Sequence, residues 1–186
     1  MILRRFLAVS AVGVSSKENP AVVSWSWVET GLPVAIPWTT KRVLPHRRWN
    51  RVRTAFPGII RSIRNIVLDL GGIDLVAVDI TRNKIDALSL ALGHLVAGAA
   101  RCSRLKFVQP TKWASVLFGP EAALALEDQS FDSLIVNAIA ASFPRFAGKV
   151  TCPQPARATG LLCWLASRYG GEKLICLPRE TELLQP

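Results

Sequence analysis

The sequence predicts an α/β protein built on a mixed five-stranded sheet with helices on both faces. The order of the hydrophobic patterns carries this prediction: three strand-like runs come first, and helical and strand-like segments alternate after them. Half of the 186 residues are hydrophobic, and a chain of this length buries roughly two-thirds of its unfolded surface as one domain. We expect that domain to span residues 1–175, followed by a C-terminal tail at 176–186.

The strands are expected from short apolar or alternating runs bounded by turn residues. Residues 6–13 are almost entirely apolar, which is typical of a central strand. In residues 21–28 every second side chain is large and apolar, which predicts a half-buried partner strand. The five expected strands cover residues 6–13, 21–28, 34–43, 74–80 and 105–109, with the first three forming an antiparallel meander.

Helical spacing of apolar residues predicts the remaining elements. In the first helix, Pro57-Gly58 is expected to kink or split the chain. His94 lies on a mostly apolar helix, so we expect a buried core histidine there rather than a catalytic one. The expected helices cover residues 47–70, 85–100, 112–118, 121–141 and 155–169.

The charge of the chain points to a polyanionic partner. The formal net charge is +10, and Arg outnumbers Lys. Because the Arg fork matches phosphate oxygens and stacks on bases, nucleic acid is the favoured partner. The alternatives are a merely solvated basic surface or a ribosomal type of RNA binding.

Two basic groups are the candidate nucleic-acid contacts. One follows the third expected strand and enters the first helix, and the other follows the strand at 74–80 directly. A solvated helix face is the competing interpretation of the larger group. The candidate residues are Arg42, Arg47, Arg48, Arg51, Arg53, Arg82 and Lys84.

Membrane insertion and metal binding by cysteines are disfavoured. The most apolar stretch, residues 85–100, is too short to span a bilayer and carries Asp86 and His94. The four cysteines show no Cys-x-x-Cys spacing, so reduced thiols in a reducing compartment (cytoplasm, phage-infected cell or organelle matrix) are expected.

One carboxylate stands out at the end of an apolar strand: Leu75-Val76-Ala77-Val78-Asp79-Ile80. Together with the segment up to Gly119, and with Cys152-Pro153-Gln154-Pro155-Ala156-Arg157-Ala158-Thr159-Gly160-Leu161-Leu162, it resembles the RuvC family of Holliday-junction resolvases. That resemblance implies an RNase H-like fold and a homodimer that binds four-way DNA junctions in DNA recombination. It also implies Mg²⁺-dependent cleavage, with the metal held by four acidic residues per subunit.

Aligned with the RuvC pattern, the four acidic positions correspond to Ser10, Asp79, Ala156 and Thr159, so three of the four are not acidic. Arg157 adds a positive charge to the same turn. Asp79 by itself could hold one Mg²⁺ ion only weakly. An ordinary structural role for Asp79, as a strand-end hydrogen-bond acceptor, is the alternative.

Three functions remain open from the sequence. The first is a RuvC-like protein that binds branched DNA or structured RNA with little or no nuclease activity, as a homodimer or within a larger complex. The second is an active Mg²⁺-dependent resolvase with displaced carboxylates. The third is a resolvase-derived structural subunit of an organellar or phage RNA–protein assembly.

Overall fold

A computed structural model gives the structure of the protein for most of the chain. It describes residues 3–12, 21–31, 38–43, 50–80, 87–119, 131–143 and 153–171. For residues 12, 21–22, 38–43, 50–55 and 87–88 it describes the backbone alone. The boundary expected between a domain and a tail at residue 175 lies outside the described residues.

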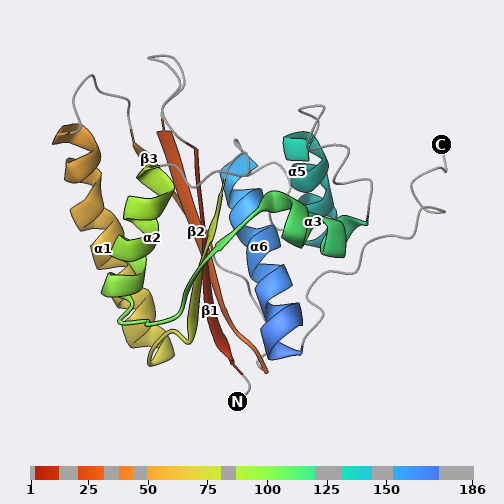
Figure 1. Cartoon of the computed structure of the whole chain (residues 1–186), viewed down its shortest axis with the longest axis horizontal. Coiled ribbons are helices and arrows are strands. Elements are labelled where there is room, and N and C mark those ends of the chain that lie inside the picture. The colour runs from red at the N-terminus through yellow and green to blue at the C-terminus, as the bar shows by residue number, and fades with distance from the viewer. Residues whose placement is uncertain are drawn as a thin grey trace.

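The described elements follow the predicted order of strands and helices (Figure 1). The first strand, the fourth strand and the last helix begin or end within two residues of their predicted limits. In chain order the elements are β1 (Arg5–Val12), β2 (Ala21–Glu29), β3 (Trp38–Val43), α1 (Asn50–Leu70), β4 (Leu75–Asp79), α2 (Ala87–Ala99), β5 (Leu105–Val108), α3 (Pro110–Phe118), α5 (Phe131–Ser142) and α6 (Pro153–Gly170).

The five strands form one mixed sheet in the order β3-β2-β1-β4-β5. The β1–β2 and β2–β3 pairs are antiparallel, whereas β1–β4 and β4–β5 are parallel. This order, with an antiparallel meander followed by parallel strands on the far side of β1, is an RNase H-like fold. The predicted five-stranded mixed sheet is confirmed, and β1, expected as a central strand, lies in its middle between β2 and β4.

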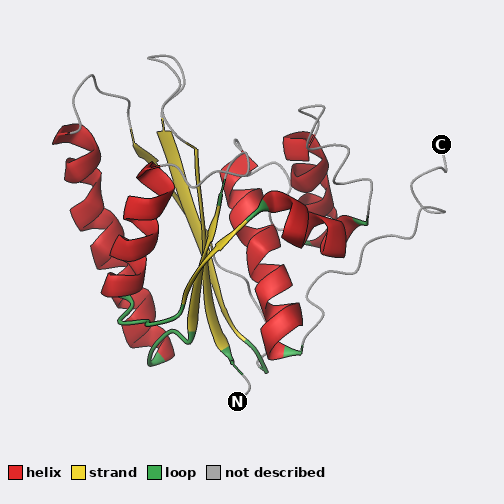
Figure 2. Ribbon diagram, in the orientation of Figure 1, coloured by secondary structure: helices red, strands yellow, loops and turns green. Residues whose placement is uncertain are grey.

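Helices cover both faces of the sheet, which separates two apolar cores (Figures 1 and 2). Successive side chains of a strand point to opposite faces, and β1 shows this directly. Phe6 and Ala8 enter the core beneath α6, while Leu7 and Val9 enter the core beneath α1 and α2. A strand buried on both faces must be apolar at every position, and this explains the unbroken apolar run in β1.

One local prediction is narrowed and another is wrong. Helix α1 continues through Pro57, so of the expected kink or split at Pro57-Gly58, the split does not occur. His94 is exposed on α2, with its ring 6.3 Å from that of Phe107, and is not a core residue. Helix α5 begins at Phe131, and the earlier part of the helix expected over 121–141 lies outside the described residues. Within the described residues, no helix is long and apolar enough to cross a membrane.

The start of β1 is tied to the turn between α1 and β4. The Asp74 carboxylate accepts hydrogen bonds from the backbone N–H groups of Arg4 (2.9 Å) and Arg5 (3.0 Å). The Arg5 guanidinium donates to the carbonyls of Leu70 and Gly71 at the end of α1 and pairs with Asp74 at 3.3 Å. Cations stabilise helix C-termini in this way, so these contacts hold β1 and β4 in register.

Asp74→Asn is expected to lower the free energy of unfolding by about 1–3 kcal/mol at neutral pH, because two backbone donors lose a charged acceptor. Burial raises the pKa of Asp74, but the hydrogen bonds from Arg4 and Arg5 and the Arg5 charge outweigh it, so the pKa lies below 3.8. A carboxyl group with a lowered folded-state pKa contributes stability above its unfolded pKa, and this stability is lost as the pH falls through the folded value.

Urea unfolding of wild type and Asp74→Asn, measured at neutral pH and again at a pH below the pKa of Asp74 in the unfolded chain, checks this expectation. The difference between the two proteins should shrink in acid. Asp69→Asn, which changes an exposed carboxyl group near the end of α1, is the matched control. An equal loss of stability in both variants, or a difference independent of pH, would contradict the assigned role.

Candidate functional site

The candidate site lies where β1 and β4 end side by side. The two strands are parallel, and the register places Ser10 directly opposite Asp79. Ser10 Oγ donates a hydrogen bond to Asp79 Oδ2 at 3.2 Å. The contact between these two sequence-predicted positions is thus a direct consequence of the strand pairing.

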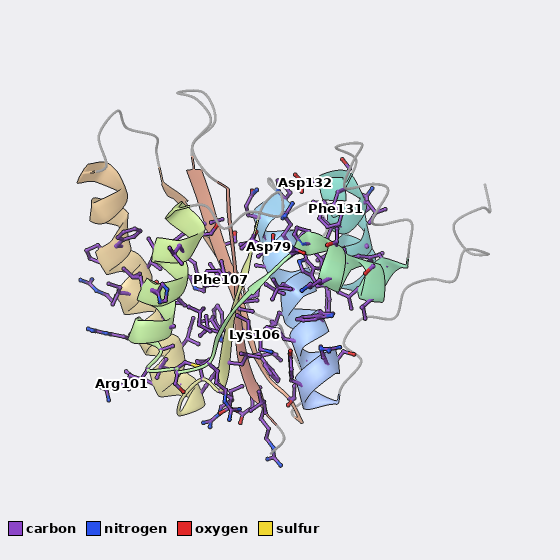
Figure 3. All side chains as sticks on the ribbon, viewed as in Figure 1. Asp79, Arg101, Lys106, Phe107, Phe131 and Asp132 are labelled. Atoms are coloured by element: carbon purple, nitrogen blue, oxygen red, sulfur yellow. The ribbon has the colours of Figure 1, made fainter. Side chains whose placement is uncertain are left out.

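The Asp79 carboxylate is fully enclosed, with 0% of the residue exposed. Besides Ser10, Oδ2 accepts a hydrogen bond from Arg157 Nε at 2.7 Å, and Oδ1 accepts one from Trp113 Nε1 at 3.0 Å. Both oxygens are therefore used by protein donors, and one of these donors carries a full positive charge. Figure 3 shows Asp79 at the sheet, on the side where α3 and α6 pack.

Arg157 is the positive centre of the site and comes from the second turn of α6. Its Nη1 donates to Asp132 Oδ1 at 3.1 Å, and its guanidinium carbon lies 5.3 Å from the centre of the Phe131 ring. Asp132 and Phe131 begin α5, and both are labelled in Figure 3. Arg157 therefore joins β4 to α5 through two carboxylates.

The electrostatics keep this guanidinium charged. Burial lowers the pKa of Arg157, but the charges and hydrogen bonds of Asp79 and Asp132 raise it above its ordinary value. The residue is 6% exposed, and its Nη2 is buried without a hydrogen-bond partner among the described residues. The other two nitrogens of the guanidinium donate to carboxylates.

A glycine on α6 lets Trp113 reach Asp79. A Cβ atom on Gly160 would lie 2.7 Å from the Trp113 ring and 3.0 Å from Ile135. Helix α3 begins at Pro110, and the first position of a helix is favoured for proline. Its Trp113 ring packs directly against Gly160. The ring is also packed edge-on against Phe131, with centroids 5.7 Å apart.

The two positions on α6 that align with carboxylates of the RuvC pattern carry no charge. Ala156 and Thr159 are buried, and the Thr159 hydroxyl hydrogen bonds with Ser26 of β2 at 3.1 Å. Among the described residues, no group of three or more His, Cys, Asp and Glu side chains converges. Mg²⁺ requires oxygen ligands in near-octahedral geometry, whereas this donor set is that of a buried ion pair with an indole and a hydroxyl.

Three of the seven basic candidates lie at the same end of the sheet, as placed by the backbone. Arg42, near the end of β3, is paired with Val22 at the start of β2, and Val22 is also paired with Val12 at the end of β1. Arg42 therefore lies at the edge of the sheet where β1 ends. Arg51 and Arg53 lie in the first turns of α1, which begins at this end of the sheet (Figure 1). The remaining candidates, Arg47, Arg48, Arg82 and Lys84, lie outside the described residues.

Sequence reasoning missed two donors to Asp79, Trp113 and Arg157, and also Asp132, the second carboxylate partner of Arg157. The buried Trp113 is not among the candidate site residues from the sequence, although its indole donates to the carboxylate. Arg157 was noted as a positive charge in the final helix without its pairing to Asp79, and Asp132 was not noted at all. The available signal was Arg157 itself. An Arg within an apolar helix is expected to be buried, and a buried positive charge requires a carboxylate partner.

Comparison with known proteins finds similarity in structure alone. No family model matches the chain, and no curated protein matches its sequence. A Thermus thermophilus RuvC structure is similar over 91% of this chain and 98% of that one, with 16% identity and a TM-score of 0.47. An Aquifex aeolicus PPX-GPPA enzyme is similar over 67% of this chain and 41% of that one, with 9% identity and a TM-score of 0.35.

Arg157→Met is expected to lower the free energy of unfolding by about 3–5 kcal/mol, because it leaves the Asp79 carboxylate buried without a countercharge. The double variant Asp79→Asn with Arg157→Met removes both charges and should recover a large part of that loss. Urea unfolding followed by circular dichroism measures both. Asp132→Asn is the matched control, and since Asp132 is about half exposed its effect should stay below about 1 kcal/mol.

A double variant as unstable as the sum of the two single variants would contradict the coupling between Asp79 and Arg157. Equal losses in Arg157→Met and Asp132→Asn would instead assign the stabilisation to the α5 contact.

Proposed function

We propose that this protein binds branched nucleic acid, with a four-way DNA junction as the first candidate, and does not cleave it. The observation that carries the proposal is the 2.7 Å contact between Asp79 and Arg157. Asp79 is the one acidic residue among the four positions aligned with the RuvC carboxylates, and Arg157 of helix α6 already balances its charge.

The absence of cleavage follows from electrostatics. Two-metal phosphodiester cleavage needs several carboxylates around ions about 4 Å apart. Here an ion entering beside Asp79 would displace Arg157 or lie next to its positive charge. It would also gain no further ligand from Ser10, Ala156 or Thr159 comparable to a carboxylate. We therefore propose that Mg²⁺ is held weakly or not at all.

Binding is supported by charge and by its placement. The net charge of +10 favours a phosphate backbone, and Arg42, Arg51 and Arg53 belong to elements that meet at the strand ends. Ligands of open α/β sheets commonly bind at the carboxyl ends of parallel strands. A surface of this kind reads the shape of a nucleic acid through phosphates rather than its sequence.

Assembly as a homodimer or within a larger complex belongs to the same proposal. Leu68 on α1 and Leu90 on α2 are exposed apolar side chains on the helical layer opposite α6. They offer apolar surface to a second copy or another subunit. Light scattering of the purified protein distinguishes a monomer from these assemblies.

Purified wild-type protein is expected to leave a labelled four-way junction uncut in Mg²⁺ or Mn²⁺, while shifting it in a gel without metal. The physical reason is the neutralised carboxylate. Asp79→Asn is the control: cleavage that persists in this variant would identify a contaminating nuclease. Metal-dependent cleavage by wild type that disappears in Asp79→Asn would overturn the proposal in favour of an active resolvase.

Arg48→Ala with Arg51→Ala is expected to weaken junction binding and to flatten its salt dependence. Each lost phosphate contact reduces the slope of log affinity against log salt by about one, so the double variant should lose about two. Binding titrations at several salt concentrations measure the slope. Unchanged affinity and slope would mean that these residues form a solvated surface, whereas tight RNA binding without junction preference would favour the structural-subunit alternative.

A further inference from the structure

A groove lined by cations and aromatic rings lies along β5, on the side of the sheet covered by α6. Its volume is about 600 Å³, within the range of ligand sites in proteins. None of the described residues that line it is acidic. They are Lys106, Phe107, Val108, Lys112, Val116, Trp164, Arg168 and Tyr169.

The cations of the groove are held against its rings. Lys106 Nζ donates to the Tyr169 hydroxyl at 2.7 Å and lies 4.6 Å from the centre of that ring. The Arg168 guanidinium lies 5.8 Å from the Trp164 ring and 5.9 Å from the Tyr169 ring. Cation–π contacts of this length orient a positive charge without neutralising it, so both cations stay available to an anion.

The groove is separate from the Asp79 site but shares two helices with it. Tyr169 lies twelve residues beyond Arg157 on α6, about 18 Å along the helix axis at 1.5 Å per residue. On α3, Trp113 faces Asp79, while Lys112 and Val116 line the groove. The two sites therefore occupy different faces of α3, and a substitution at Lys112 leaves the Asp79 contacts in place.

We infer that this groove binds a single-stranded segment of nucleic acid, with phosphates contacting Lys106, Lys112 and Arg168 and a base packing against the aromatic side. Interleaved cations and rings along a groove are the chemistry of strand binding without sequence preference. An acidic peptide would pair its carboxylates with the cations but would have no base to pack against the aromatic rings. The inference rests on nucleic acid being the partner, as proposed above, and assigns it a second surface.

The electrostatics of Tyr169 give a direct probe of the groove. Burial raises the pKa of Tyr169, but the hydrogen bonds and charges of Lys106 and Arg168 lower it below its ordinary value of 10.0. A phosphate bound to these two cations reduces their positive field and so raises the pKa of Tyr169. Because Tyr169 is the only tyrosine of the chain, tyrosinate absorbance reports on this position alone.

The test measures binding of a short labelled oligothymidylate by fluorescence anisotropy. Lys112→Glu with Arg168→Glu should weaken it by about tenfold or more at low salt, since two phosphate contacts become repulsive. Arg61→Glu with Arg101→Glu is the matched control, because both residues are exposed on the opposite helical layer and the charge change is equal. A thermal melt of each variant checks that its fold is retained.

The blunt four-way junction, measured with the same variants, separates the two proposals. Loss of oligothymidylate binding in the groove variant, with junction binding reduced much less, supports the inference. Equal losses in groove and control variants would overturn it, as would an absence of oligothymidylate binding by a wild type that binds the junction. If the wild-type protein binds oligothymidylate but does not bind the four-way junction, the proposed function is overturned instead.

Tyrosinate titration with and without ligand completes the test. A short oligodeoxyadenylate, whose bases unlike thymine do not ionise near pH 10, should raise the pKa of Tyr169, and inorganic phosphate at the same phosphate concentration should raise it less. An equal response to phosphate, or to polyglutamate, would mean that the groove takes any anion, and the strand assignment would be overturned.

Discussion

The buried ion pair between Asp79 and Arg157 is the constraint on which the arrangement of this molecule depends. A carboxylate with no exposure cannot remain charged inside a protein without a partner. Arg157 is that partner, and its position sets how α6 lies across the sheet. Trp113 and Asp132 then bring α3 and α5 to the same point. With Ser10 included, the ion pair and its hydrogen-bond partners thus join β1, β4, α3, α5 and α6.

The same contacts are the basis of the proposal that the protein binds nucleic acid without cleaving it. Arg157 balances the charge of Asp79, so the ends of β1 and β4 are packed around a buried ion pair. In the proposed function, an Arg held against this carboxylate neither activates water nor bridges a phosphate to a metal. The positive charge around the strand ends, by contrast, depends on residues outside this pair. Under the proposed function, binding and cleavage therefore depend on different residues.

Helices α3 and α6 each serve two sites because their side chains point in different directions at different turns. The N-terminal half of α6 faces β4 with Arg157, and its C-terminal end presents Arg168 and Tyr169 to the groove along β5. On α3 the buried side carries Trp113 and the exposed side Lys112.

The sequence by itself determined the order of the elements and the central position of β1, and its resemblance to the RuvC pattern singled out Ser10 and Asp79. The order of the elements and the central strand follow from local periodicity, since a strand buried on both faces is apolar at every position. The sequence also determined the excess of positive charge. Only the tertiary structure decided that Arg157 and Trp113 are the donors to Asp79, that His94 is exposed, and that Lys106, Lys112 and Arg168 meet in one groove. Those outcomes depend on the rotation of each helix against the sheet, and that rotation is set by packing between residues far apart in the chain, such as Gly160 against Trp113.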